Sequence, residues 1–321
     1  MKAGKLQKDK VNIITLGCSK NLVDSEVLSG QLMANDIDVL HENKKLDHNI
    51  VVVNTCGFID KAKEESINTI LDQVHLKRKG KLDKVYVTGC LSERYRQDLE
   101  NEIPEVDAWF GTFEMPLLLR QLNADYKKEL LGERLLSTPN HYAYLKISEG
   151  CNRTCSFCAI PLMRGKHVSK TFEEIISEAK VLVKQGVKEI MLIAQELTYY
   201  GLDIYRKRAL ADLLNQLADV EGIEWIRLHY AYPNKFPMDV LDVMRSRPNI
   251  CKYLDMPLQH ASNNMLEAMR RQSTRTEIED TLAAIRDAVP GICLRTTLIA
   301  GFPGETQNDV DDVKDFLQKQ R

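Results

Sequence analysis

Short apolar runs alternate with amphipathic stretches over residues 1–135. The runs predict buried strands at 11–16, 50–53, 85–88 and 106–110, and helical spacing of apolar residues predicts helices at 24–33, 61–79, 93–101 and 115–122. Strands that alternate with helices are typical of a parallel sheet wound by right-handed crossovers. The pattern therefore predicts a small α/β domain.

The same alternation returns in residues 136–321, after a linker at 136–141 that contains Thr138-Pro139. Strands are expected at 142–147, 189–194, 225–230, 253–258 and 293–300. Helices are expected at 172–184, 210–217 and 309–321, and a helical pair at 262–288. Parallel α/β barrels place their chemistry at the carboxyl ends of the strands. We expect a partial (βα) barrel with its site at that end.

Charge and composition narrow the functional class. Forty-four basic and forty-six acidic residues give a net charge of -2, which leaves no global electrostatic signature of nucleic-acid binding, although a local basic patch stays possible. The charged segment Met1 to Lys10 lacks the apolar core of a signal peptide, and no apolar run is long enough for a membrane span. We therefore expect a cytoplasmic protein, in which eight cysteines indicate metal or redox ligands rather than disulfides.

The loop between Gly150 and Gly165 carries Cys151, Cys155 and Cys158 in a C-x-x-x-C-x-x-C spacing. Three thiolates of one short loop can converge on a metal centre, but they supply no fourth ligand. Because an iron–sulfur cluster is normally held by four thiolates, a three-cysteine loop leaves one iron open to a substrate or cofactor. A structural zinc site or simple packing is the alternative, although no second cysteine pair or nearby C-x-x-H follows.

A second set of cysteines is spread over the first domain. Cys18, Cys56 and Cys90 each follow a predicted strand directly or almost directly, and the carboxyl ends of parallel strands meet at one edge of the sheet. Any one free cysteine could be a small buried hydrophobic residue. Their shared topological position instead predicts a second three-thiolate cluster, again with one open iron.

Phe157, just before the last cysteine, completes a loop that resembles the cluster loop of the radical S-adenosylmethionine (radical SAM) superfamily. The continuation Ala159-Ile160-Pro161 and Arg164-Gly165 resembles the methylthiotransferase branch. Gly17-Cys18-Ser19-Lys20-Asn21, Asn54-Thr55-Cys56 and Gly89-Cys90 are similar to the three cluster motifs of that branch's first domain.

The resemblance implies a flavodoxin-like domain over 1–135 and a radical SAM partial barrel over 136–321. It also implies a sixth barrel strand and a carboxyl-terminal TRAM-type β domain, for which this chain has no residues. We therefore expect an incomplete barrel.

The implied activity is radical methylthio transfer with two 4Fe-4S clusters and SAM. The segment 16–26 is similar to the opening motif of the branch that modifies the β-carbon of an aspartate in ribosomal protein S twelve of the small subunit. That branch implies a one-electron reductant such as flavodoxin or ferredoxin, and a sulfur donor that the sequence leaves unknown. The same chemistry on a transfer RNA adenosine is the first alternative, and a non-catalytic iron–sulfur or electron-transfer module is the second.

Other strand ends carry weaker candidates. By resemblance, Gln195 and Glu196 receive the amino group of SAM, or else they form a polar helix cap. Gly301 supports the cofactor, or else belongs to an ordinary turn. Arg295 is either buried beside a carboxylate or exposed. His229 and His260 are expected to be structural or polar-rim residues, and Cys251 and Cys293 are expected to be packing residues.

Overall fold

The computed structural model describes residues 9–128, 130 and 132–320. The chain divides into two compact units: one runs to Pro139 and includes Leu162–Arg164, and the other contains Asn140–Pro161 and the residues from Gly165 onward. Most of the charged segment Met1 to Lys10 and the last residue of the final predicted helix, Arg321, lie outside the described residues. No helix within the described ranges has the length and apolar character needed to cross a membrane.

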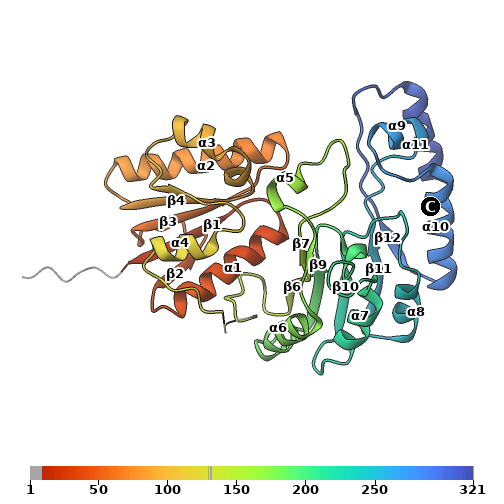
Figure 1. Cartoon of the computed structure of the whole chain (residues 1–321), viewed down its shortest axis with the longest axis horizontal. Coiled ribbons are helices and arrows are strands. Elements are labelled where there is room, and N and C mark those ends of the chain that lie inside the picture. Colours follow the sequence, from red (N-terminus) through yellow and green to blue (C-terminus); the bar gives the residue numbers. More distant parts are fainter. Residues whose placement is uncertain (1–8, 129, 131, 321) are drawn as a thin grey trace, which may run out of the picture. The chain divides into compact units, whose positions relative to one another are not determined.

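The first unit is built on a five-stranded parallel sheet in the order β2-β1-β3-β4-β5 (Figure 1). Its strands are β1 (Lys10–Thr15), β2 (Asp38–His41), β3 (Ile50–Thr55), β4 (Lys84–Gly89) and β5 (Ala108–Trp109). This is the flavodoxin-like strand order, so the predicted class is confirmed. The sequence interpretation missed β2, a short edge strand in which no residue is fully buried.

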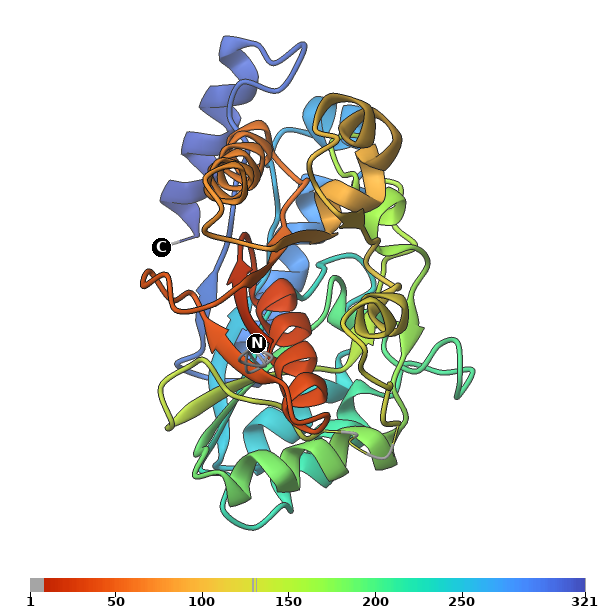
Figure 2. The same ribbon diagram turned by 90° about the vertical axis from the view of Figure 1, so that its left-hand side faces the viewer.

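Helices cover both faces of this sheet, as Figures 1 and 2 show from two directions. They are α1 (Ser19–Met33), α2 (Asp60–Arg78), α3 (Cys90–Glu102) and α4 (Met115–Gln121). In β3, Ile50 and Val52 pack in one core with residues of α1 and α4, whereas Val51 and Val53 pack in a second core with residues of α2 and α3. Because both faces are buried, the strand reads as a continuous apolar run.

The second unit contains a five-stranded parallel sheet in the order β12-β11-β10-β9-β6. Its strands are β6 (Tyr142–Lys146), β9 (Glu189–Ile193), β10 (Trp225–Leu228), β11 (Ile250–Asp255) and β12 (Cys293–Arg295). Neighbours in the sheet follow one another in the chain, as in a (βα) barrel. The predicted parallel (βα) architecture is confirmed.

The main helices of this unit are α6 (Phe172–Lys184), α7 (Leu210–Ala218), α8 (Asp239–Ser246), α9 (Asn263–Ala268), α10 (Arg275–Ala288) and α11 (Gln307–Lys319). Helix α6 has the predicted bounds and begins with a capping box between Thr171 and Glu174. Helix α8 was not predicted, although Val240, Leu241 and Met244 have helical spacing and are buried. The helical pair predicted over 262–288 is confirmed as α9 and α10.

Candidate metal centres

The C-x-x-x-C-x-x-C loop starts at the carboxyl end of β6. A two-stranded ribbon of β7 (Ser148–Glu149) and β8 (Val168–Ser169) joins the ends of the loop. The Cys151 N–H donates to the Gly165 carbonyl at 3.1 Å, and this bond also holds the two ends of the loop together. The three cysteines therefore lie within one closed loop above the barrel sheet.

Contacts to the end of α9 hold the middle of this loop. The Ser156 N–H donates to the Met269 carbonyl at 3.1 Å, and the Ser156 hydroxyl donates to the Ala268 carbonyl at 2.8 Å. A further bond from the Cys158 N–H to the Cys155 carbonyl, at 3.1 Å, closes a turn between the last two cysteines. The loop is thus held both by hydrogen bonds to the end of α9 and by a bond within its own backbone.

The thiols of the loop are shielded from water. Burial raises the pKa of Cys151 to about 11, with smaller contributions from negative charge on Glu196 and on the other two cysteines. Burial also raises the pKa of Cys158, and the nearby Arg271 opposes that rise. The Arg271 Nη1 donates to the Cys155 Sγ at 3.5 Å. Without a bound metal the shielded thiols Cys151 and Cys158 stay protonated near neutral pH, and metal coordination would deprotonate them.

Phe157 is half-buried in this loop. Of the two candidates that follow β9, Gln195 is half-buried and Glu196 is buried. Glu196 is buried and accepts bonds from the Arg153 Nε at 2.9 Å and from the Thr198 N–H and hydroxyl at 2.9 and 2.8 Å. It is the N-cap of a short 3₁₀ helix, η1 (Leu197–Tyr199), as the alternative interpretation supposed. The Gln195 side chain donates to Glu149.

Three of the second unit's buried polar atoms that have no hydrogen-bond partner among the described residues belong to residues that follow strands of its sheet. They are the Ser148 Oγ, the Gln195 Oε1 and the His229 Nε2, which follow β6, β9 and β10. Buried polar atoms are normally satisfied by protein, water or a ligand. These atoms are therefore candidates for hydrogen bonds to a bound polar ligand.

The remaining candidates of this unit lie near β11 and β12. Arg295 is half-exposed and pairs with the buried Asp255 at 2.9 Å, so it has both features that the sequence left open. His260 is buried and contacts the Glu305 carboxylate at 3.1 Å, in keeping with a structural role. Gly301 is exposed with φ +77°, its N–H donates to Glu305, and a Cβ there would meet nothing within 4 Å. Cys293 is exposed, which corrects its interpretation as a packing residue; Cys251 is half-buried.

In the first unit, the strand register brings the second set of cysteines to one edge. Thr15 of β1 pairs with Asn54 of β3, and Asn54 pairs with Thr88 of β4. Cys18, Cys56 and Cys90 follow these aligned strand ends. The point between β1 and β3, where the strand order reverses, is the usual ligand site of a flavodoxin-like sheet.

Two glycines let these loops approach each other. A Cβ on Gly17 (φ +95°) would lie 2.6 Å from the Cys56 Cβ and 2.8 Å from its Sγ. A Cβ on Gly89 (φ +98°) would lie 2.4 Å from the Asn54 Oδ1. Glycine before Cys18 and Cys90 thus allows both the backbone conformation and the close approach.

The thiols of this second set also interact. Burial is the main cause that raises the pKa of Cys90 to about 11; Arg164 acts against the rise, and negative charge on Cys18 and Cys56 contributes to it. Burial likewise raises the pKa of Cys56. The set offers three sulfur donors, which is the chemistry that iron–sulfur clusters require.

Within the described ranges, no three His, Cys, Asp or Glu side chains lie close enough together to hold a single metal ion. A cluster distributes its thiolates over different irons and so spaces them more widely than one ion does. Both cysteine sets remain predictions as ligand sets.

Sequence reasoning missed the polar side chains that surround the thiols. Arg164 and Asn21 are buried beside Cys90, and Arg271 is buried beside Cys155. The motifs quoted above contain Asn21 and Arg164, but nothing in their spacing indicates a contact between residues 143 positions apart. For Arg271 the sequence offered no signal.

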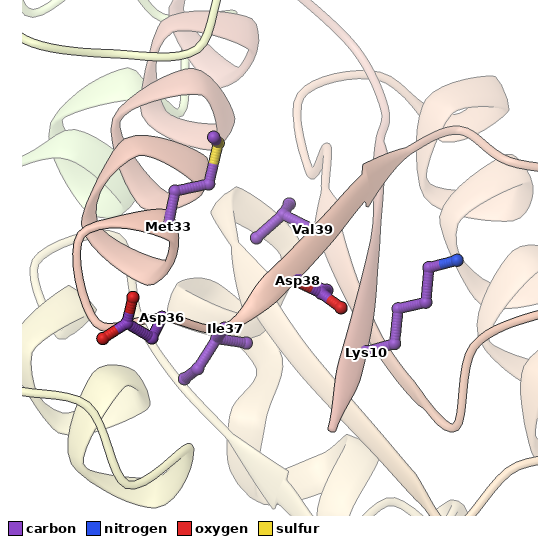
Figure 3. Close-up of a pocket in the computed structure, with 6 residues that line it drawn as sticks. All are labelled: Lys10, Met33, Asp36, Ile37, Asp38 and Val39. Atoms are coloured by element: carbon purple, nitrogen blue, oxygen red, sulfur yellow. The ribbon is translucent and has the colours of Figure 1, made fainter. Parts of the chain in front are cut away.

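A surface hollow of about 390 Å³ lies in the first unit, beside the edge strand β2 (Figure 3). Its lining consists of Lys10, Met33, Asp36, Ile37, Asp38 and Val39. The hollow is open and contains no thiol, so it is not the candidate site.

Comparisons with known families agree with the two-part organisation. The family described as "Uncharacterized protein family UPF0004" matches residues 10–111, and the radical SAM superfamily matches residues 145–317. The ribosomal protein uS12 methylthiotransferase RimO of Cytophaga hutchinsonii is 61% identical over 321 residues, which are 100% of this chain and 74% of that protein. The RimO of Flavobacterium johnsoniae is 62% identical over 322 residues, with 100% and 74% coverage.

Among solved structures, the fold is similar to the radical S-adenosylmethionine methyltransferase TsrM from Kitasatospora setae with tryptophan and a SAM analogue bound. The TM-score is 0.70 at 14% identity, over 98% of this chain and 71% of that one. At this identity the similarity concerns the fold alone.

Proposed function

Because this chain belongs to the ribosomal protein uS12 methylthiotransferase (RimO) family, a branch of the radical SAM superfamily, we propose that it transfers a methylthio group to the β-carbon of an aspartate in uS12. Membership in the superfamily implies SAM and a 4Fe-4S cluster as cofactors. A second cluster on Cys18, Cys56 and Cys90 belongs to the proposal. A ribosomal substrate favours the cytoplasm as the site of action.

The observation that carries the proposal is the presence of a second cysteine set at the switch point of the first sheet. Generation of a radical requires only the loop of Cys151, Cys155 and Cys158. Transfer of sulfur requires an additional place where sulfur is held, and three strand-end thiols with one open iron provide it.

When bound, the first cluster and SAM supply radical chemistry at an unactivated C–H bond, SAM also supplies the methyl group, and the second cluster supplies the sulfur. The chain's residues bind and shield these groups. The loop of 150–165 holds the first cluster, while Ser148, Gln195 and His229 offer partners to the polar groups of SAM. Burial of Cys151 and Cys155 keeps water from two of the thiolates that would hold the cluster.

Two partners complete the proposal. A one-electron reductant such as flavodoxin or ferredoxin would supply the electrons, and a sulfur donor, whose identity we do not assign, would replenish the second site. Both have to act on the same chain under anaerobic conditions, because an open iron is exposed to oxidants.

The substrate is tested by competition. Anaerobically reconstituted protein, reductant, SAM and sulfide are incubated with uS12 and transfer RNA in one tube, and both substrates are read by mass spectrometry. We expect the methylthio group on an aspartate of uS12. Its appearance on an adenosine of the transfer RNA would refute the substrate assignment, and absence of SAM cleavage would refute the enzyme assignment.

The division of labour between the cysteine sets is tested by two variants. Cys155→Ala should abolish release of deoxyadenosine, whereas Cys56→Ala should preserve it and stop sulfur transfer. Cys293→Ala is the matched control, because this exposed cysteine belongs to neither set. Methylthiolated product from Cys56→Ala would refute the role of the second set.

A further inference from the structure

Arg164 is a buried cation that lies against the second cysteine set within the first unit. Its Nε donates to the Cys90 Sγ at 3.2 Å, its Nη1 donates to the Asp24 carboxylate at 2.6 Å, and its Nη2 donates to the Asn21 side-chain oxygen. A guanidinium stays charged and offers several donors in a rigid plane. The Nε of Arg164 therefore donates to a thiol, while its two terminal nitrogens are held by Asp24 and Asn21.

Asn21 extends these contacts to the other two cysteines. Its Nδ2 donates to the Leu16 carbonyl at 2.8 Å and to the Thr55 carbonyl at 3.0 Å. Leu16 belongs to the loop of Cys18, and Thr55 immediately precedes Cys56. Asn21 and Arg164 together thus connect the three segments that carry the thiols.

The charge of Arg164 also faces the set. Its Nε lies 3.2 Å from the Cys90 Sγ, and its side chain is buried beside that thiol. The potential of an iron–sulfur cluster depends on nearby charge and on hydrogen bonds to its sulfurs. A buried guanidinium that donates to one ligand sulfur affects the potential both by its charge and by its hydrogen bond.

We propose that Arg164 is a positioning residue of the second cluster, which it holds through Cys90 and Asn21 and whose reduction potential it raises. This inference rests on the proposed function, because it assumes a cluster on Cys18, Cys56 and Cys90. The alternative is a purely structural role, in which the pair of Arg164 and Asp24 stabilises the fold and leaves the potential unchanged.

The test uses the full chain with Cys151, Cys155 and Cys158 replaced by alanine, so that only the first unit's set can hold a cluster. After anaerobic reconstitution, iron content, the rate of iron loss to a chelator and the midpoint potential by electron paramagnetic resonance are measured. These readouts do not depend on enzyme activity. The compared variants are Arg164→Met and Arg164→Lys.

Arg164→Met should lower the potential by a tenfold shift in the one-electron equilibrium, about 59 mV, and should lose iron faster. Arg164→Lys keeps the charge without the planar fork, so it should restore most of the potential. The matched control is Arg134→Met, which removes a buried arginine of the same unit that pairs with Glu26 at 2.9 Å. The control should leave the potential unchanged.

Asp24→Asn supplies a second variant should Arg164→Met fail to bind a cluster. It removes a negative charge beside the guanidinium and should move the potential in the opposite, positive direction. Equal potentials in all four variants, or an equal shift in Arg134→Met, would overturn the inference. If the chain that lacks only Cys151, Cys155 and Cys158 binds no iron, the proposed second cluster itself is refuted, and with it the basis of the inference.

Discussion

Gly89→Ala should disable the second cysteine set while leaving the first set intact. Gly89 ends β4 directly before Cys90 and has φ 98° and ψ -164°. This region of backbone conformation is essentially restricted to glycine. The added methyl group would also lie 2.4 Å from the Asn54 Oδ1 and 2.6 Å from the Thr55 carbonyl oxygen.

Two costs therefore add up. Holding alanine in this conformation costs about 1–3 kcal/mol. Both contacts are also shorter than those that Cβ atoms make in proteins, so the backbone or the neighbouring side chains have to move. Asn54 cannot yield freely, because its Nδ2 donates to the Asn21 carbonyl and to the Ser25 hydroxyl, each at 2.9 Å. We expect a total loss of more than about 3 kcal/mol in the free energy of unfolding.

The assay combines urea unfolding with iron analysis. Gly80→Ala is the control in the same unit: Gly80 has φ +66°, but an added Cβ would meet nothing within 4 Å, so only about 1–2 kcal/mol of backbone strain is expected. Gly89→Ala should bind about half the iron of the parent and still cleave SAM. A loss of stability no larger than that of Gly80→Ala, with full iron content, would refute the reasoning.

Two further predictions concern stability alone. Arg134→Met leaves the buried Glu26 carboxylate without its ion pair and should cost about 3–5 kcal/mol in urea unfolding; an unchanged midpoint would contradict this. Burial lowers the pKa of His48, with Asp47 opposing the shift, so the folded chain binds fewer protons than the unfolded chain. The free energy of unfolding should therefore fall as the pH drops through about 6.5, and His48→Gln should reduce that fall. Equal pH dependence of parent and variant between about pH 7 and pH 5 would count against the assignment.

Much of the fold could be predicted because buried parallel strands produce continuous apolar runs. Ile50 to Val53 form such a run, and both faces of that strand are covered by helices. Edge strand β2 escaped prediction for the opposite reason: its residues are at most half-buried, so they show no sustained apolar pattern.

The cysteines could be predicted from topology, since parallel strands place their carboxyl ends at one edge. Their polar surroundings could not. Arg164 reaches Cys90 and Asn21 across 74 and 143 positions of the chain, and Arg271 reaches Cys155 across 116. Such contacts depend on how loops fold back on the sheet, which local periodicity does not encode.

The most direct test of the account is an iron and sulfide count on three anaerobically reconstituted proteins. The parent should bind about eight irons per chain, and variants without either Cys18, Cys56 and Cys90 or Cys151, Cys155 and Cys158 should each bind about four. Only the variant that keeps Cys151, Cys155 and Cys158 should release deoxyadenosine from SAM. A parent with about four irons, or a variant without Cys18, Cys56 and Cys90 that still binds about eight, would contradict the central claim that each unit holds its own cluster.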